Sequence, residues 1–216
     1  MTRAWMQTLS GRAITMAKPN AREIDPLLDL PEMLARIPRF NGAVPGGHYS
    51  VAQHSVMIAD TILDDGGDAD TAAVGLLHDA HEYIWGDLTT PAQDGLSEIE
   101  KELFGDSRVE AVIREAKRRA DEAIYRACGV PWPPAPQQVR TVKAYDMRML
   151  ATERRQLLSP CGRRWNAAIE KAEPLKMRGR LSPWSIARSA DEFRNRLGQL
   201  CPAITRKSQT MGAFRG

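Results

Sequence analysis

All four histidines of the chain lie in two short segments, GGHYSVAQH and LLHDAHE, as His48, His54, His78 and His81. His78 and Asp79 directly follow the apolar run AAVGLL, which predicts that both side chains are mostly buried. A buried carboxylate is costly unless it is paired with a charge or bound to a metal ion. Any single histidine is adequately explained as a hydrogen-bonded core or surface residue, but the combination favours a divalent metal site.

Ligands for such a site must come from more than one helix. Neighbours such as His78 and Asp79 diverge by about 100° on a helix, so both can approach one ion but cannot complete its coordination shell. His54, on the apolar side of the preceding helix, and Asp146, on the inner face of a later one, are the candidates for the remaining ligands. Two imidazoles and two carboxylates suit one Mn²⁺, Co²⁺, Fe²⁺ or Zn²⁺ ion, with Mg²⁺ as a further possibility. The three widely spaced cysteines offer no competing site.

The apolar spacing of the segment YSVAQHSVMIADTILDDGG, 49–67, predicts the helix that positions His54. Ser50 and Gln53 have the spacing of a capping box at its start. The pair of glycines that closes the segment predicts its end. His54 would therefore lie on the second turn.

A second helix should begin at Asp68 or Asp70 and run through TAAVGLLHDAHEYI, 71–84. We expect it to end near WGDLTTP, because Gly86 and Pro91 break helices. The acids and histidines of HDAHE would then lie on one continuous helix.

Two longer amphipathic patterns follow. The segment 96–134 predicts one broken helix or two consecutive helices, closed by Gly129 and a proline-rich turn. The segment 136–158 predicts a further helix, with Asp146 inside its apolar face. An acid in that position points toward the other helices.

The two ends of the chain differ from its middle. The first 45 residues contain five prolines and predict turns and short helical pieces around PLLDLPEMLARIP. SADEFRNRLGQL, 189–200, predicts one more helix, with Ser189 and Glu192 as a capping box. No alternating strand of useful length occurs, so the predicted fold class is an all-α bundle.

The composition predicts one domain, or one domain with an appendage. The chain has 216 residues, of which 43% are hydrophobic and 26% charged. No apolar run approaches the roughly 20 residues of a membrane helix, and the N-terminus lacks an export signal, so we expect a cytoplasmic protein without membrane contact. From Cys161 to Gly216 there are 12 basic and 4 acidic residues. Their short basic runs have no regular aromatic interleaving, which favours a solvated or self-associating surface over nucleic-acid binding.

The order of these residues, with the segments YSVAQHS, LLHDAHE and GDLTTP, resembles the HD-domain superfamily of metal-dependent phosphohydrolases. It is most similar to the branch that contains bacterial 5′-deoxynucleotidases and deoxynucleoside triphosphohydrolases. The resemblance covers about residues 36–158. It implies an HD-type helical bundle in 1–160, with an irregular Pro-rich N-terminal segment, and a basic extension, 161–216, packing on the same domain. The divalent metal ligands that it implies are His54, His78, Asp79 and Asp146.

The same resemblance gives catalytic roles to two further acids. In the similar nucleotidases, the equivalents of Glu82 and Asp87 act around the attacking water and the leaving oxygen. Glu82 is therefore expected to orient or deprotonate the water, and Asp87 to donate a proton to the departing sugar oxygen. The alternative remains open that Glu82 is a solvated helix acid and Asp87 a turn residue bonded to backbone amides.

Substrate contacts are expected around the same motifs. Arg39 and Phe40 occupy the place of an Arg-Trp pair that holds phosphate and sugar in the resembling deoxynucleotidases; Arg39 suits a phosphate clamp, while Phe40 departs from the pattern and is as well explained by core packing. Lys143 lies one helical turn before Asp146 and pairs naturally with phosphate. His81 and Thr89 are further candidates for the pocket.

The predicted function is divalent-metal-dependent hydrolysis of a small nucleotide, most of all a deoxynucleoside 5′-monophosphate. Removal of triphosphate from a deoxynucleoside triphosphate is the alternative within the same class. A non-catalytic nucleotide-sensing or nucleic-acid-binding module is the alternative from another class, with the basic tail as its support. Because phosphohydrolases of this type are often oligomers, a homodimer is expected.

Overall fold

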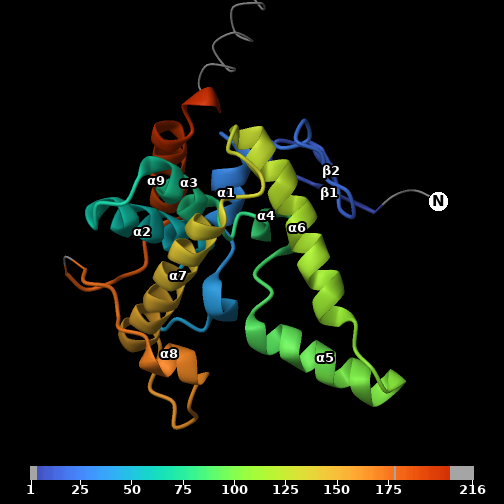
Figure 1. Cartoon of the computed structure of the whole chain (residues 1–216), viewed down its shortest axis with the longest axis vertical. Coiled ribbons are helices and arrows are strands. Elements are labelled where there is room, and N and C mark those ends of the chain that lie inside the picture. Colours follow the sequence, from blue (N-terminus) through green and yellow to red (C-terminus); the bar gives the residue numbers. More distant parts are fainter. Residues whose placement is uncertain (1–3, 178, 205–216) are drawn as a thin grey trace, which may run out of the picture.

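The protein is all-helical in its main body, as the sequence predicts (Figure 1). The computed structural model describes residues 4–177 and 179–204. Residues 205–216 of the predicted C-terminal extension lie outside the described residues. Helices α2 (Val51–Asp64) and α3 (Ala69–Leu77) pack against each other at the centre. Both also contact α7 (Pro136–Gln156) and α9 (Ile186–Leu200), so segments far apart in the sequence form one core.

Helix α2 begins at the predicted Ser50 cap, but only half of the predicted capping box forms, because the Gln53 side chain bonds to the backbone of Ser182 and Trp184 instead. The Ser50 hydroxyl accepts a hydrogen bond from the backbone N–H of Gln53 at 3.2 Å, which caps the first turn. α3 runs close beside α2 because Gly75 has no side chain: a Cβ there would lie 2.8 Å from Cδ1 of Ile62. The close approach brings the C-terminal end of α3 to the second turn of α2, where His54 lies.

The prediction of one helix over 71–84 is wrong, because α3 ends at Leu77. His78 caps the C-terminus of α3. After it the chain forms tight turns with hydrogen bonds from residue i to residue i−3, such as the one from the Glu82 N–H to the Asp79 carbonyl at 3.0 Å. A separate short helix, α4 (Glu82–Trp85), follows and ends at Gly86. His78 and Asp79 therefore lie at a bend in the chain.

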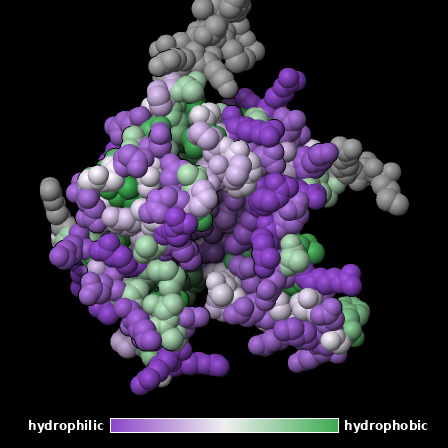
Figure 2. Space-filling view, in the orientation of Figure 1, coloured by the Kyte–Doolittle hydropathy of each residue, from purple (hydrophilic) through white to green (hydrophobic). Residues whose placement is uncertain are grey.

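The segment 96–134 contains two helices rather than one broken helix. α5 (Thr90–Phe104) has Pro91 in its first turn, where the backbone N–H that proline lacks would have no partner within the helix. Pro91 therefore lies at the start of a helix, while Gly86 ends the helix before it. α6 (Val109–Cys128) ends at Gly129, as predicted, with the glycine in the left-handed conformation. Helix α5 and the first part of α6 project from the body of the molecule (Figure 1), whereas the last turns of α6 bury Ile124 and Tyr125 in the core. The surface is hollowed between α5 and that body (Figure 2).

The C-terminal segment is part of the same core. After the short helix α8 (Ala167–Lys171), α9 packs against α1, α2 and α3 and buries Phe193 and Leu197. The predicted capping box at Ser189 and Glu192 is wrong: α9 begins one turn earlier, and its cap is Ser185. Ser189 is buried inside the helix, where its small side chain allows close packing.

The N-terminal segment contains the short helical pieces that its prolines predict, α1 (Asp29–Leu34) and the 3-10 turn η1 (Arg39–Gly42). It also contains an unpredicted antiparallel hairpin of β1 (Trp5–Gln7) and β2 (Ala13–Thr15), with Met6 opposite Ile14. Strands of three residues are too short to show an alternating pattern. Within the described residues, no helix has the length and apolar character needed to cross a membrane.

Candidate metal centre

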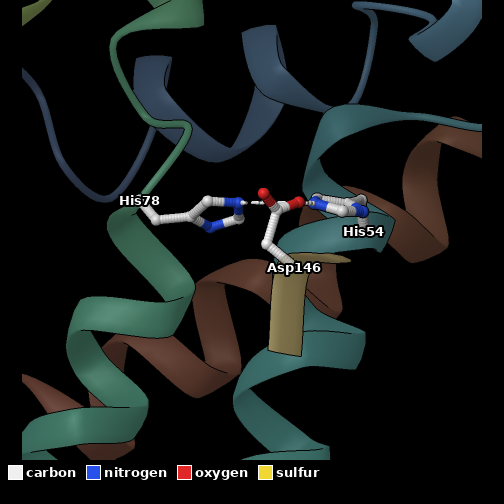
Figure 3. Close-up of side chains that lie close together, drawn as sticks. All are labelled: His54, His78 and Asp146. Carbon is white, nitrogen blue, oxygen red and sulfur yellow. Dashed lines mark hydrogen bonds and ion pairs between the residues drawn. The ribbon is translucent and has the colours of Figure 1, made fainter. Parts of the chain in front are cut away.

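The structure brings the four predicted metal ligands together. His54 comes from α2, His78 and Asp79 from the turn that directly follows α3, and Asp146 from α7. The Nε2 atom of His54 lies 3.3 Å from Nε2 of His78, 3.5 Å from Oδ1 of Asp146 and 3.7 Å from Oδ2 of Asp79. Figure 3 shows the carboxylate of Asp146 between the two imidazoles. Donor atoms at these separations can surround one ion.

Both imidazoles present the nitrogen that a metal needs. Nδ1 of His54 lies 2.6 Å from a carboxylate oxygen of Glu153, and Nδ1 of His78 lies 2.8 Å from the carbonyl oxygen of Gly75. Both partners only accept, so each Nδ1 carries a hydrogen and the Nε2 atoms of the two rings are turned toward each other. Two facing lone pairs need a cation or a proton between them, so the donor set fits a divalent ion.

Glu153 holds this arrangement in place, although the sequence analysis did not single it out. Its fully buried carboxylate also accepts the Tyr49 hydroxyl at 2.7 Å and an Arg39 nitrogen at 3.2 Å. Burial opposes its charge, but Arg39 and His54 outweigh burial and hold the pKa of Glu153 below its usual value. A signal did exist: Glu153 lies seven residues after Asp146, hence on the same face of α7.

Arg39, predicted to clamp phosphate, instead contacts two acids of the cluster. One of its terminal nitrogens lies 3.4 Å from Asp79 and the other 3.2 Å from Glu153, and only 10% of the side chain is exposed. Burial disfavours the charged guanidinium, but these carboxylates outweigh burial and raise the pKa of Arg39. Its observed contacts orient a predicted ligand and the carboxylate that holds His54.

The charges of the four ligands are strongly interdependent. Burial raises the pKa values of Asp79 and Asp146, but the neighbouring histidines outweigh burial, and both pKa values are lowered. For His78, burial lowers the pKa, but Asp79 outweighs it together with Asp146, and the result is a pKa of about 9. Without a metal, a proton therefore occupies the space between the ligands at neutral pH.

The two predicted catalytic acids lie beside the cluster. Glu82 is the first residue of α4 and is only 6% exposed; one of its oxygens is within 4.8 Å of donor atoms of Asp79 and His81. Burial raises its pKa to about 10, and Asp79 and Asp87 add to this. Asp87 is half-buried just after Gly86, and burial also raises its pKa. Neither acid is a freely solvated surface group.

The predicted substrate residues Phe40, Lys143 and Thr89 each have a different environment. Phe40 adopts the left-handed conformation, with φ of 56°, and its ring centroid lies 6.3 Å from that of Trp165. Lys143 is 67% exposed and forms a 2.8 Å ion pair with Asp146. Thr89 is half-buried at the start of α5 and makes no side-chain cap bond. Trp165 thus lies beside a predicted substrate residue.

The remaining histidines are both held by hydrogen bonds. His81 is buried, and its Nδ1 lies 3.1 Å from a carboxylate oxygen of Asp121 on α6, a residue that the sequence analysis did not single out. His48 contacts the carbonyl oxygen of Ala35 through Nε2 at 2.7 Å. His81 therefore belongs to the region of the cluster, whereas His48 fastens a loop to α1.

The fold and the site together define an all-helical protein with a His/Asp cluster that could hold a metal ion. The chain belongs to the same family as an uncharacterized protein of Rhodobacter capsulatus, with 31% identity over 197 residues, which cover 88% of this chain and 93% of the relative. The uncharacterized protein YfdR of Escherichia coli is 30% identical over 162 residues, 75% of this chain and 77% of that protein. No protein-family model matches the chain.

Proposed function

We propose that the protein is an HD-type, divalent-metal-dependent phosphohydrolase that acts on small nucleotides, most of all deoxynucleoside 5′-monophosphates. The observation that carries the proposal is the pair of imidazole Nε2 atoms, 3.3 Å apart, with the carboxylates of Asp79 and Asp146 beside them. A divalent ion held there supplies positive charge beside a phosphoryl oxygen and lowers the pKa of nearby water. The family relationship adds no function, since both relatives are uncharacterized.

Glu82 and Asp87 supply the acid and base groups of the proposal. Asp87 has a raised pKa, so it keeps a proton to higher pH than an exposed aspartate and can donate it to the departing sugar oxygen. Glu82 is buried beside Asp79, and a cation in the cluster would favour its charged form, which can accept a proton from water. The two acids thus take opposite parts in one hydrolytic step.

Basic side chains near the cluster would bind the phosphate. Lys143 is exposed, and its one ion pair within the described residues is with Asp146, so its ammonium can turn toward an incoming anion. Arg39 adds a fixed positive charge beneath the site. Phe40 and Trp165 form an aromatic pair against which a sugar or base would pack.

Metal content and products test this proposal. The protein is purified without added metal, its bound metals are measured by mass spectrometry, and Mn²⁺, Co²⁺, Mg²⁺ or Zn²⁺ is supplied with deoxynucleoside mono- and triphosphates. We expect a bound transition metal and release of nucleoside with orthophosphate, both lost in Asp79→Ala and kept in the control His48→Gln. Release of tripolyphosphate would show that the substrate is a deoxynucleoside triphosphate instead of a monophosphate. Bound metal without any phosphate product would show that the proposal is wrong and favour a sensing module.

We also propose that the protein acts as a cytoplasmic homodimer. Helix α5 exposes large apolar side chains at its C-terminal end, with Leu103 68% and Phe104 77% exposed. Such groups on a projecting helix pair are typical of surfaces that associate. Light scattering at micromolar concentration should give twice the mass of the chain, and a monomer mass would contradict the dimer.

A further inference from the structure

His81 and Glu82 bury polar atoms for which the described part of the chain supplies no partner. Each residue is 6% exposed, and Nε2 of His81 and Oε2 of Glu82 form no hydrogen bond with any described residue. A buried polar atom left unsatisfied costs about 1–3 kcal/mol. Such atoms on two adjacent residues therefore point to a ligand bound in this region.

Asp79 lies close to both residues. One donor atom from each of Asp79, His81 and Glu82 lies within 4.8 Å of the other two. Ligands about 2.1 Å from one divalent ion are at most about 4.2 Å apart, so small side-chain movements would close this triangle around an ion. The set of one imidazole and two carboxylates suits Mn²⁺, Fe²⁺, Co²⁺ or Zn²⁺.

Asp121 prepares His81 for metal binding. Its carboxylate oxygen lies 3.1 Å from Nδ1 of His81, so that nitrogen carries the hydrogen and the lone pair stands on the buried Nε2. A carboxylate behind the imidazole is the usual partner of a metal-binding histidine. The same arrangement occurs at His54, where Glu153 takes this part.

We propose that Asp79, His81 and Glu82 form a second divalent-cation site, which shares Asp79 with the cluster of His54, His78 and Asp146. One carboxylate between two ions is consistent with the spacing of about 3.5–4 Å found in two-metal hydrolytic sites. Glu82 would bind through Oε2, which leaves its other oxygen for the role proposed above. The binding of a second ion does not depend on the proposed function. Any contact of that ion with the phosphate of a substrate rests on the proposed function.

The test counts manganese in the metal-free protein after titration with Mn²⁺. We expect about two tightly bound ions per chain, with the spin-coupled electron paramagnetic resonance signal of a manganese pair. His81→Gln should bind about one ion without the coupled signal, and the control His48→Gln should bind about two. A wild-type protein that binds one ion, or two ions without coupling, would overturn the proposal.

Two further substitutions keep the test decisive if His81→Gln does not fold. Asp121→Asn leaves all three proposed ligands in place and should weaken the second ion by about 10- to 100-fold, with the first ion unchanged. Glu82→Gln should abolish the coupled signal, and circular dichroism checks the helical content of each variant. Unchanged manganese binding in both would contradict the second site.

The outcome separates the second site from the proposed function. Two coupled ions with no hydrolysis of any nucleotide would support the site and refute the phosphohydrolase. Hydrolysis by a protein that holds a single ion would support the phosphohydrolase and refute the second site.

Discussion

The imidazole rings of His54 and His78 face each other with 3.3 Å between their Nε2 atoms, while both Nδ1 atoms are engaged on the opposite sides of the rings. The space between the rings must hold a positive species, because two lone pairs at this distance repel each other. A proton fills that need in the metal-free protein, since the pKa of His78 is about 9. A metal ion and a proton therefore compete for one place.

This competition predicts the pH dependence of stability. A histidine whose pKa is raised from 6.5 to about 9 by folding contributes stability below pH 6.5, and the contribution is lost as the pH rises through 9. The metal-free protein should lose up to about 3 kcal/mol of unfolding free energy across this range. The raised pKa of Glu82 acts in the same direction, because its buried carboxyl becomes charged. Urea unfolding at pH 6 and pH 9 measures the difference.

Mn²⁺ should stabilise the protein more at high pH than at low pH, because it binds only deprotonated ligands. The rise in melting temperature caused by Mn²⁺ should be larger at pH 8.5 than at pH 6, and His78→Gln should remove most of this difference. A metal-free protein whose stability stays constant or increases from pH 6.5 to pH 9 would contradict the proton between the rings.

Glu153 is predicted to be important for both the stability of the protein and its affinity for manganese, although it is not a proposed ligand. Glu153→Gln removes the charge that balances Arg39 and places an amide N–H where three donors now converge. We expect a loss of about 3–5 kcal/mol of unfolding free energy, since one partner of a buried ion pair is removed. Manganese affinity should fall by about 10- to 100-fold, because His54 loses its orienting partner.

Calorimetric titration and denaturant unfolding measure the two effects of Glu153→Gln. The exposed Glu98 on α5 provides a matched control, and Glu98→Gln should change neither quantity. Wild-type metal affinity in Glu153→Gln would mean that the backbone alone orients His54.

The contrast between His54 and Glu153 shows how much of the site the sequence could predict. His54, His78, Asp79 and Asp146 were found because a buried acid next to a histidine needs a partner, and the structure brings them together. Glu153 was missed because a lone acid among the basic residues of ATERRQ resembles a solvated helix residue. Its burial depends on Tyr49 and Arg39, which lie far away in the sequence.

The fold shows the same division between local and long-range information. Apolar periodicity and the Ser50 cap predicted α2 correctly, and the periodicity also indicated a mainly helical fold. The break after Leu77 was not predictable from propensity, because neither glycine nor proline lies between Leu77 and Glu82. Tertiary contacts at this bend, such as His78 with His54 and His81 with Asp121, accompany a turn that the local sequence does not require.

Gly75 is predicted to set the distance between the two imidazoles. A Cβ at this position would lie 2.8 Å from Ile62 and 3.2 Å from Ile58, both on α2. Gly75→Ala should therefore push α3 away from α2, lower the unfolding free energy by about 1–3 kcal/mol and weaken manganese binding. Gly95→Ala, in α5, meets no atom within 4 Å and should instead stabilise the protein by about 0.5–1 kcal/mol.

Thermal unfolding and manganese titration of the two alanine variants measure this effect. The opposite signs expected for Gly75→Ala and Gly95→Ala separate crowding from helix propensity. If Gly75→Ala stabilises the protein and binds manganese normally, α3 has more room beside α2 than the close contact with Ile62 indicates.

Glu82 and Asp87 are predicted to act in opposite protonation states, Glu82 as a charged carboxylate and Asp87 as a protonated carboxyl. Glu82→Gln removes the group that accepts a proton from water, and Asp87→Asn removes the one that donates a proton to the leaving oxygen. Each should lower kcat by about 10²- to 10⁴-fold at pH 7. Asp94→Asn, at an exposed position on α5, should keep full turnover.

A substrate with a better leaving group separates the two roles. Replacing the nucleoside by 4-nitrophenol makes protonation of the leaving oxygen unnecessary, so this ester should restore much of the activity of Asp87→Asn but not that of Glu82→Gln. Orthophosphate release from both substrates, at saturating manganese, is the measurement. Equal recovery of both variants would show that neither residue has the proposed part, and full turnover of both on the nucleotide would remove these two acids from the mechanism.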